Sequence, residues 1–404
     1  MIRVLTTILI TICSLWPARM NAQTYKNFRQ IPTDADASMI VNIIQDSYGM
    51  VWIGTNNGLY SYDGYTMYAH NQGPEYVKTH IYCSLNMDGD RLFLGTDNGL
   101  IIYNYRTDSY EPAPIKFPRD IRAMAKDGNI LWIGSFEGLF AYNLTTKRLK
   151  HYDARQYRGL SHNTIYSIIK GTNGNIYIGT YNGLCFYNSR SHCFTRIALP
   201  LSARKSNVFV NSLLEDRISR CIWIGTEGNL YKLSLSSGKV DNITEFHDNS
   251  IKVLSMDSHH RLLVGTDNGL FIYDGRHIIQ HVLHDSRNAS SLSNDVVWSI
   301  LHDSNGNVWL GTDDGLSMTP RIQDLQFTPI SQITGQGAGN HFYCIYRDIN
   351  GLLWLGGSNG LISSAANLSS PQTSHWYRVD NTAYPITHNR IRQIYEDREH
   401  HLWI

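Results

Sequence analysis

Short apolar runs recur along the chain, and each ends in a glycine followed by a hairpin signal. The first run, Val51–Thr55, reads VWIGT and leads through Asn57-Gly58 into a second apolar stretch. Asn-Gly accepts positive φ at low cost and so favours a tight turn between two strands. Related words return at intervals of 39 to 46 residues, with the repeated glycine at positions 54, 95, 134, 179, 225, 265, 311 and 356. This pattern predicts one supersecondary unit repeated along the chain.

Each unit is expected to contribute four short strands. A β-branched run such as Met39–Ile44 precedes a turn with Asp and Gly, the two strands of the hairpin follow, and a weaker strand near Tyr68 or Tyr152 ends the unit. Strands at such regular spacing, with turn signals between them, indicate an all-β repeat. Because Val51, Trp52 and Ile53 follow one another without polar alternation, we expect the middle strands to be buried on both faces.

The repeats themselves must cover these faces, since no long segment has the 3.6-residue period of a helix. Small sheets that pack against the sheets before and after them bury both faces, and closing the stack into a ring removes its exposed ends. The sequence therefore predicts an all-β fold: a seven-bladed β-propeller with the first part of a second propeller. An open β-solenoid and a single eight-bladed ring are the alternative geometries.

The N-terminal segment, residues 1–22, has the features of a secretory signal peptide. Arg3 precedes an apolar run from Val4 to Trp16, and Ala22 provides a small residue at the junction. The run is too short to span a bilayer. We therefore predict export to the periplasm, with a mature chain that begins near Gln23.

The repeat array itself divides into two predicted domains. Residues 23–320 are assigned to the seven-bladed ring, whose last blade is expected to be completed by an N-terminal strand near Phe28. The seventh unit ends in GLSMTPRIQ instead of a Tyr-Asp turn, and a strand like that of Phe28 restarts near Phe327. Residues 321–404 are therefore assigned to the start of a second, truncated propeller.

Composition excludes some classes of partner. The chain has 404 residues, 42% of them hydrophobic and 17% charged, and a net charge of +1, so nothing indicates a nucleic acid or an acidic partner. Five cysteines follow the signal segment at places that do not repeat, which is not the pattern of a disulfide framework. Cys185 and Cys193 flank a turn and could pair, although two free thiols are favoured.

Motifs that suggest catalysis or metal binding have simpler explanations within the repeat. Gly356–Gly360 reads GGSNG and resembles a serine-nucleophile elbow at Ser358, but it aligns with the hairpin word GTNNG and no helix follows it. The pairs His259-His260 and His400-His401 lie in turns far apart in sequence, without HExxH or CxxC spacing. We therefore predict no catalytic residue, no metal site and no cofactor.

Acidic and aromatic side chains give two further patterns. Four carboxylates follow the Gly-Thr words and could form an acidic rim, although the same residue types are common in turns; they are Asp97, Asp267, Asp313 and Asp314. Most tryptophans share one place in the unit and are interpreted as core residues, namely Trp52, Trp132, Trp223, Trp309, Trp354 and Trp403. Trp298 and Trp376 fall outside that place.

One set of polar positions is a candidate ligand-binding site. These residues lie at the start of the innermost strand of a unit, on the face of the ring that carries the Gly-Thr loops, where they could surround the mouth of a central channel. Together with Ser38, the predicted ligand-binding residues are His80, Asn163, Asn249, Asp295 and Trp298. The simpler interpretation is that these are strand-start residues solvated by channel water.

The phrase D-x-x-G-x-x-W-I-G-T-x-x-G-L resembles the two-component regulator propeller repeat, over nearly all of residues 24–404. The resemblance implies the periplasmic sensor region of a hybrid two-component system of glycan-foraging gut bacteria. In that family two seven-bladed propellers and a small β-sandwich precede a membrane helix, a histidine kinase, a receiver and a DNA-binding domain. No kinase or receiver motif and no second hydrophobic segment occurs in this sequence, so the resemblance implies the sensing half only.

Two classes of function stay open at this point. The first is a binding module that recognises an oligosaccharide or a periplasmic partner protein, catalyses nothing, and reaches the membrane only through segments beyond this sequence. The resemblance allows a homodimer of the full-length receptor. The second is a propeller lyase or glycosidase that acts on polysaccharide, which needs a pair of carboxyl groups at a defined separation. No unit has the long acid-bearing insertion that usually carries such a pair, so we favour binding.

Overall fold

The computed structural model describes residues 25–31, 33, 38–71, 78–200, 208–319, 341–364 and 375–404. The chain divides into two compact units, Met1–Gln323 and Asp324–Ile404, which are described separately below. The proposed signal peptide, the boundary residue 320 and the Phe327 strand lie outside the described residues. No helix in the described part of the chain has the length and apolar character needed to cross a bilayer.

The first unit consists of four-stranded antiparallel sheets, each built from consecutive strands except the last. The first three sheets comprise β2 (Ile40–Gln45), β3 (Val51–Thr55), β4 (Gly58–Tyr62) and β5 (Met67–Ala69); β6 (Ile81–Met87), β7 (Arg91–Thr96), β8 (Gly99–Asn104) and β9 (Ser109–Glu111); and β10 (Ala123–Asp127), β11 (Ile130–Gly134), β12 (Leu139–Asn143) and β13 (Leu149–Tyr152). The next two comprise β14 (Ile165–Lys170), β15 (Asn175–Thr180), β16 (Gly183–Asn188) and β17 (Cys193–Ile197); and β18 (Val210–Asp216), β19 (Cys221–Thr226), β20 (Leu230–Ser234) and β21 (Val240–Ile243).

A short 3-10 helix, η3 (Thr244–Phe246), precedes the remaining two sheets of this unit, except for the N-terminal strand that joins the last of them. They comprise β22 (Ile251–Met256), β23 (Leu262–Thr266), β24 (Gly269–Tyr273) and β25 (Ile278–Val282); and β26 (Val297–His302), β27 (Val308–Thr312), β28 (Leu316–Thr319) and β1 (Arg29–Ile31). The described residues of the first unit thus form seven four-stranded sheets.

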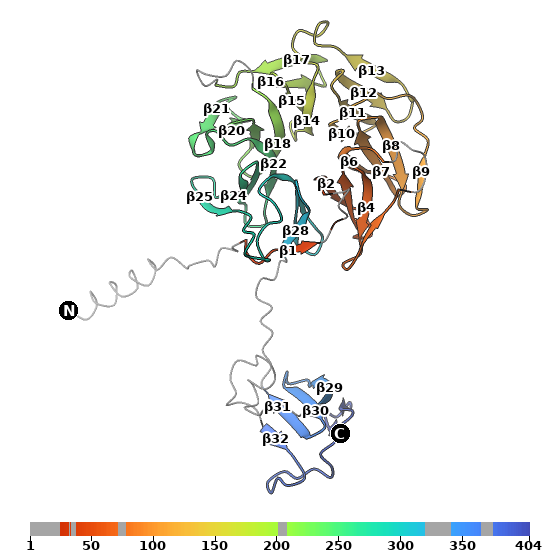
Figure 1. Cartoon of the computed structure of the whole chain (residues 1–404), viewed down its shortest axis with the longest axis vertical. Helices are drawn as coiled ribbons and strands as arrows, with labels where there is room; N and C mark the ends of the chain where they lie inside the picture. The colour runs from red at the N-terminus through yellow and green to blue at the C-terminus, as the bar shows by residue number, and fades with distance from the viewer. Residues whose placement is uncertain are drawn as a thin grey trace, which may run out of the picture. The chain divides into compact units, whose positions relative to one another are not determined.

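The seven sheets close into a ring. Their first strands pack against one another in the order β2, β6, β10, β14, β18, β22 and β26, and β26 packs against β2 again; Figure 1 shows the sheets arranged around a common centre. β1 pairs antiparallel with β28, with Gln30 opposite Ser317, so the N-terminal strand completes the last sheet as the sequence indicated. The prediction of an all-β propeller fold is confirmed.

The repeated glycine is where each sheet meets the next. A Cβ placed at Gly54 would lie 2.7 Å from Cγ2 of Ile81, and one placed at Gly311 would lie 2.5 Å from the carbonyl oxygen of Ile40. The same approach brings Gly95 to Ile121, Gly134 to Ile165, Gly179 to Val210, Gly225 to Ile251 and Gly265 to Val297. We call these seven contacts the glycine seam. The repeat therefore needs glycine here because a neighbouring strand occupies the space of a side chain.

The tryptophan of the repeat is held by the turn Asp that precedes it. Asp46 accepts hydrogen bonds from the backbone nitrogens of Tyr48 and Met50, and its second oxygen accepts the indole Nε1–H of Trp52 at 2.8 Å. The same Asp–Trp pair, six residues apart, is found as Asp303–Trp309, Asp348–Trp354 and Asp397–Trp403. In the third and fifth sheets the spacing is five and seven residues, and the buried indole nitrogens of Trp132 and Trp223 have no hydrogen-bond partner among the residues that the structure describes.

The second unit contains the sheet of β29 (Phe342–Arg347), β30 (Leu353–Gly357), β31 (Gly360–Ser364) and β32 (His375–Tyr377), and the pair β33 (Tyr395–Glu396) and β34 (Leu402–Trp403).

Trp52, Trp132, Trp223 and Trp309 are buried as expected of core residues. Trp403 is 63% exposed, so the prediction that it is a core residue is wrong. Cys185 is buried, Cys193 is exposed, and both are free thiols.

Candidate ligand-binding site in the central cavity

In six of the seven sheets, a bulge at the start of the innermost strand directs one side chain toward the centre of the ring. In β2 the register with β3 shifts between Ile40 and Asn42, which leaves Val41 without an opposite residue. Equivalent shifts leave Tyr82, Tyr166, Asn211, Lys252 and Trp298 unpaired in their strands. A bulge of this kind re-aims the side chain of the extra residue. Each of these residues directly follows the apolar residue that meets a seam glycine.

These bulged residues surround one cavity. Arg122, which follows the seam residue Ile121 and precedes β10, occupies the corresponding place in the third sheet. We call the seven residues the inner ring: Val41, Tyr82, Arg122, Tyr166, Asn211, Lys252 and Trp298. All seven line a cavity of about 370 Å³, together with Met39, His80, Phe209 and Glu227. The composition, with several aromatic rings and a few polar heads, is typical of a small-molecule site.

Stacked groups form one wall of this central cavity. The rings of His80 and Tyr82 are 4.2 Å apart and nearly parallel, and the guanidinium carbon of Arg122 lies 3.5 Å from the centre of the Tyr82 ring. The same guanidinium lies 4.4 Å from the ring of Phe136, which makes an edge contact with Tyr166. The wall therefore joins the second, third and fourth sheets through aromatic and cation–π contacts.

Across the ring, the sixth and seventh sheets provide a second group. The ammonium of Lys252 lies 5.0 Å from the ring of Trp298 and donates a hydrogen bond to Ser250 Oγ at 2.8 Å. The indole Nε1–H of Trp298 donates to Asp313 at 3.1 Å. One predicted acidic-rim residue thus serves to orient an aromatic ring at the cavity.

The electrostatics of the stacked wall favour a neutral His80. Burial lowers the pKa of His80, the positive charge of Arg122 lowers it further, and Asp97 opposes both. Burial also raises the pKa of the phenols of Tyr82 and Tyr166, so both remain protonated donors near neutral pH. The buried atoms His80 Nε2, Arg122 Nε and Asp97 Oδ1 have no hydrogen-bond partner among the described residues. Unpaired buried polar atoms are rare in proteins and call for a partner such as water or a ligand.

The structure separates the predicted ligand-binding residues into two groups. His80 and Trp298 line the central cavity. Asn163, Asn249 and Asp295 do not line it: the Asn163 side chain bonds Ala154 N and Asp153, Asn249 bonds the His247 carbonyl, and Asp295 accepts His284 N. The side chains of these three residues stabilise loops through hydrogen bonds. Sequence reasoning missed Tyr82, Arg122 and Lys252. The signal that marks them in the sequence is their place directly after the apolar residue that meets a seam glycine.

Carboxylates suited to hydrolysis are sparse in this cavity. Glu227 is the one carboxylate among its described lining residues, whereas a glycosidase needs a pair. Of the other rim residues, Asp267 accepts the backbone N–H of Ser250. The described residues contain no group of three or more His, Cys, Asp or Glu side chains that could hold a metal ion.

A Ser–His–Asp constellation lies elsewhere, at the contact of the first two sheets. His70 Nε2 is 2.8 Å from Ser61 Oγ, and His70 Nδ1 is 2.9 Å from Asp108 Oδ1. Ser61 is 5% exposed, in the middle of β4, and it does not line the central cavity. A nucleophile needs access to its substrate, so this group is interpreted as a structural link. Ser358 accepts the backbone N–H of His341 and also takes part in a hairpin.

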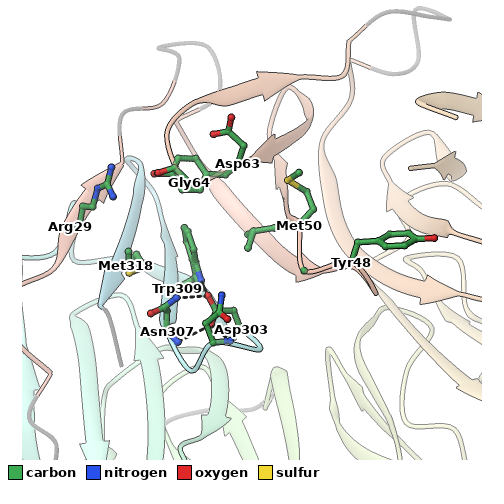
Figure 2. A pocket seen from close by; sticks show the side chains of 13 residues that line it. Arg29, Tyr48, Met50, Asp63, Gly64, Asp303, Asn307, Trp309 and Met318 are labelled. Carbon is green, nitrogen blue, oxygen red and sulfur yellow. Dashed lines mark hydrogen bonds between the residues drawn. The ribbon is translucent and has the colours of Figure 1, made fainter. Parts of the chain in front are cut away.

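A second cavity, of about 380 Å³, lies where the last sheet meets the first (Figure 2). Arg29, Asp63, Asp303 and Trp309 are among its lining residues, and Figure 2 shows the dashed bonds that join Asp303 to its neighbours. Asp63 Oδ1 accepts the backbone N–H groups of Tyr65 and Thr66, and both oxygens of Asp303 accept backbone, amide and indole donors. These carboxylates are committed to turns, so this cavity offers less free polar chemistry than the central one.

Comparison with known proteins agrees with the ring architecture. The family model for the two component regulator propeller matches residues 36–57, 159–182, 291–314 and 336–359. Two solved structures of one extracellular domain from B. thetaiotaomicron, assigned as a one component or a hybrid two component system, have 48% sequence identity and a TM-score of 0.71. Each alignment covers 94% of this chain and 51% of the chain in the solved structure, so this chain spans about half the length of that domain.

More distant structures share the fold alone. A second extracellular domain of a B. thetaiotaomicron protein assigned as a hybrid two component system has 18% identity and a TM-score of 0.63, over 94% of this chain and 52% of its own. A streptogramin B lyase has 11% identity and a TM-score of 0.56, over 72% of this chain and 96% of its own. None of the curated proteins matches the chain.

Proposed function

Because this chain carries repeats of the two component regulator propeller family and resembles an extracellular domain at 48% identity, we propose that it is the ligand-sensing region of a signalling receptor. The region is exported to the periplasm, binds an oligosaccharide in the central cavity and catalyses no reaction. Signal transmission to a kinase takes place through parts of the receptor beyond this sequence.

The observation that carries this proposal is the inner ring. The seam residues repeat from sheet to sheet, whereas the seven inner-ring positions hold six different residue types, four of them with aromatic or cationic side chains. Aromatic rings pack against the apolar faces of sugar rings, and amide, hydroxyl and carboxylate groups bond their hydroxyls. Tyr166, Phe209 and Trp298 provide such rings, and Asn211 and Glu227 provide such polar heads.

Binding has to be coupled to signalling by a difference in affinity between two states of the receptor. A closed ring is a rigid support, because each sheet is packed on both sides by its neighbours. We therefore expect the ligand to change the packing of an element that contacts the ring, and not the ring itself. A homodimer of the receptor would be one such element.

Isothermal titration calorimetry of the full chain against a panel of plant and host glycan digests tests the proposal. We expect micromolar to millimolar binding by at least one oligosaccharide, lost on Trp298→Ala and kept on Tyr65→Ala, since Tyr65 is 89% exposed and outside the cavity. Product formation from any digest, measured by chromatography, would favour the lyase or glycosidase alternative. If no saccharide binds, the oligosaccharide assignment fails and a periplasmic partner protein becomes the preferred ligand.

A further inference from the structure

The two cations of the central cavity are held by aromatic rings instead of carboxylates. Arg122 lies over Tyr82 and Phe136, and Lys252 lies over Trp298. No carboxylate of the described residues comes within ion-pair distance of either. Elsewhere in the same unit several cations do contact acids, as in Arg91–Glu111, Arg106–Asp90, Lys126–Asp88 and Lys170–Asp127.

A ring face positions a cation without using its hydrogen-bond donors. The attraction acts on the charge through the face of the ring, so the N–H groups stay available. In Arg122 the buried Nε–H is one such donor without a partner in the described part of the chain. A buried donor without a hydrogen bond destabilises the protein, and a ligand that provides an acceptor would remove this penalty.

The remaining charges in the lining do not cancel these two. Glu227 is the one carboxylate that lines the cavity, and His80 is held toward its neutral form by burial and by Arg122. Asp313 accepts the indole N–H of Trp298. The described lining therefore carries two positive charges and one negative charge, with one guanidinium that lacks a partner for Nε.

We infer that the saccharide bound in the central cavity carries an anionic group, a carboxylate or a sulfate ester, which Arg122 binds and Lys252 attracts from the opposite side of the ring. A planar guanidinium with free N–H groups can make two parallel hydrogen bonds to such a group. Tyr166, Phe209 and Trp298 pack against the sugar ring that bears it. This inference rests on the proposed function, because it names the ligand class of that same cavity.

Matched pairs of probes test the charge directly. Trigalacturonate is compared with its carboxyl-reduced form, and 6-sulfated N-acetyllactosamine with the unsulfated disaccharide, by calorimetry on the full chain. We expect the anionic member of at least one pair to bind about tenfold tighter or more than its neutral partner, since a hydrogen bond to a charged group is worth about a factor of ten or more. The pair that shows the preference distinguishes a carboxylate from a sulfate ester. The preference should shrink as salt is raised.

Substitutions locate the charge. Arg122→Gln should abolish the preference for the anionic probe, and Arg122→Lys should keep part of it because one point charge remains. Lys150→Gln is the control, since Lys150 also lies over a ring, 4.6 Å from that of Tyr152, but does not line the cavity. Thermal unfolding of each variant shows whether the chain is folded.

The outcomes separate this inference from the proposed function. Equal affinity for the charged and neutral members, with binding lost on Trp298→Ala, overturns the anionic ligand and leaves saccharide binding in the cavity intact. Binding of neither member of either pair also overturns the anionic ligand, and the wider glycan panel then decides the proposed function. A preference that survives Arg122→Gln would place the anion elsewhere and equally overturn the assignment.

Discussion

The glycine seam and the inner ring are adjacent in sequence and opposite in character. Each sheet gives one glycine to the seam, and that glycine touches the residue directly before an inner-ring position of the next sheet. The seam repeats the same contact seven times in the described ring, whereas the inner ring holds Val, Tyr, Arg, Tyr, Asn, Lys and Trp. The seam therefore determines how the sheets pack, and the inner ring is free to vary. We expect ligand recognition at the positions where the repeats carry different residues.

The largest expected effect comes from adding one methyl group to the seam. In Gly311→Ala the new Cβ would lie 2.5 Å from the backbone oxygen of Ile40, and backbone cannot move aside as a flexible side chain can. We expect a loss of about 3 kcal/mol in the free energy of unfolding, measured by urea denaturation. Val41→Ala, at the neighbouring inner-ring position, should cost less than about 1 kcal/mol. Equal losses would remove the distinction between seam and ring.

The Asp–Trp pair provides the next effect. Asp46 is itself buried, and Asp46→Ala removes the acceptor for the buried indole of Trp52 and for two backbone nitrogens of the turn, so we expect a loss of about 2 kcal/mol. Asp127 occupies the corresponding turn of the third sheet but does not reach Trp132, and its side chain pairs with Lys170 at the surface. Asp127→Ala should therefore change stability by no more than about 0.5 kcal/mol. Chemical denaturation of both variants checks the difference.

The repeat allowed the fold to be predicted, but only part of the site. The positions of Gly54 and its equivalents define the length of the repeat, and Trp52 and its equivalents mark the buried strand in each repeat. The spacing of six residues from Asp to Trp also marks, in the sequence, the indoles that have an acceptor. The site was missed at Tyr82 and Lys252 because a bulge directs these side chains inward, and a bulge does not follow from simple alternation. Arg122 was missed because it lies just before β10, outside the strand pattern. Asn163 and Asp295 looked equivalent to His80 but are held by loop hydrogen bonds.

The contact of Ser61, His70 and Asp108 belongs to the packing between sheets, not to the inner ring. His70 also contacts Trp52 and lies 2.9 Å from the Tyr103 hydroxyl, so it joins four side chains. We expect His70→Phe to cost about 1 kcal/mol in the free energy of unfolding. A fluorophosphonate probe, which labels activated serines, should not react with the chain. Labelling that disappears in Ser61→Ala would show that this group is a nucleophile and would revive the enzyme alternative.

The smallest expected effect is a pH dependence at the inner edge of the ring. Burial and the charge of Arg122 lower the pKa of His80 below its ordinary value of 6.5. The unfolded chain then binds the proton more readily than the folded one as the pH falls through 6.5, so His80 makes stability decrease toward acid. This loss levels off below the folded pKa of His80. Burial lowers the pKa of His162 and His302 as well, and both act in the same direction.

Comparison with a variant isolates the share of His80 in this acid effect. The free energy of unfolding of His80→Gln should fall less between pH 7 and pH 5 than that of the native chain, because His162 and His302 still titrate and His80 is gone. Arg122→Gln should raise the pKa of His80 toward 6.5, as followed by proton NMR of the imidazole signal that is missing in His80→Gln. An unchanged pKa in Arg122→Gln would mean that burial alone holds His80 neutral, and that the stacked wall is not coupled through charge.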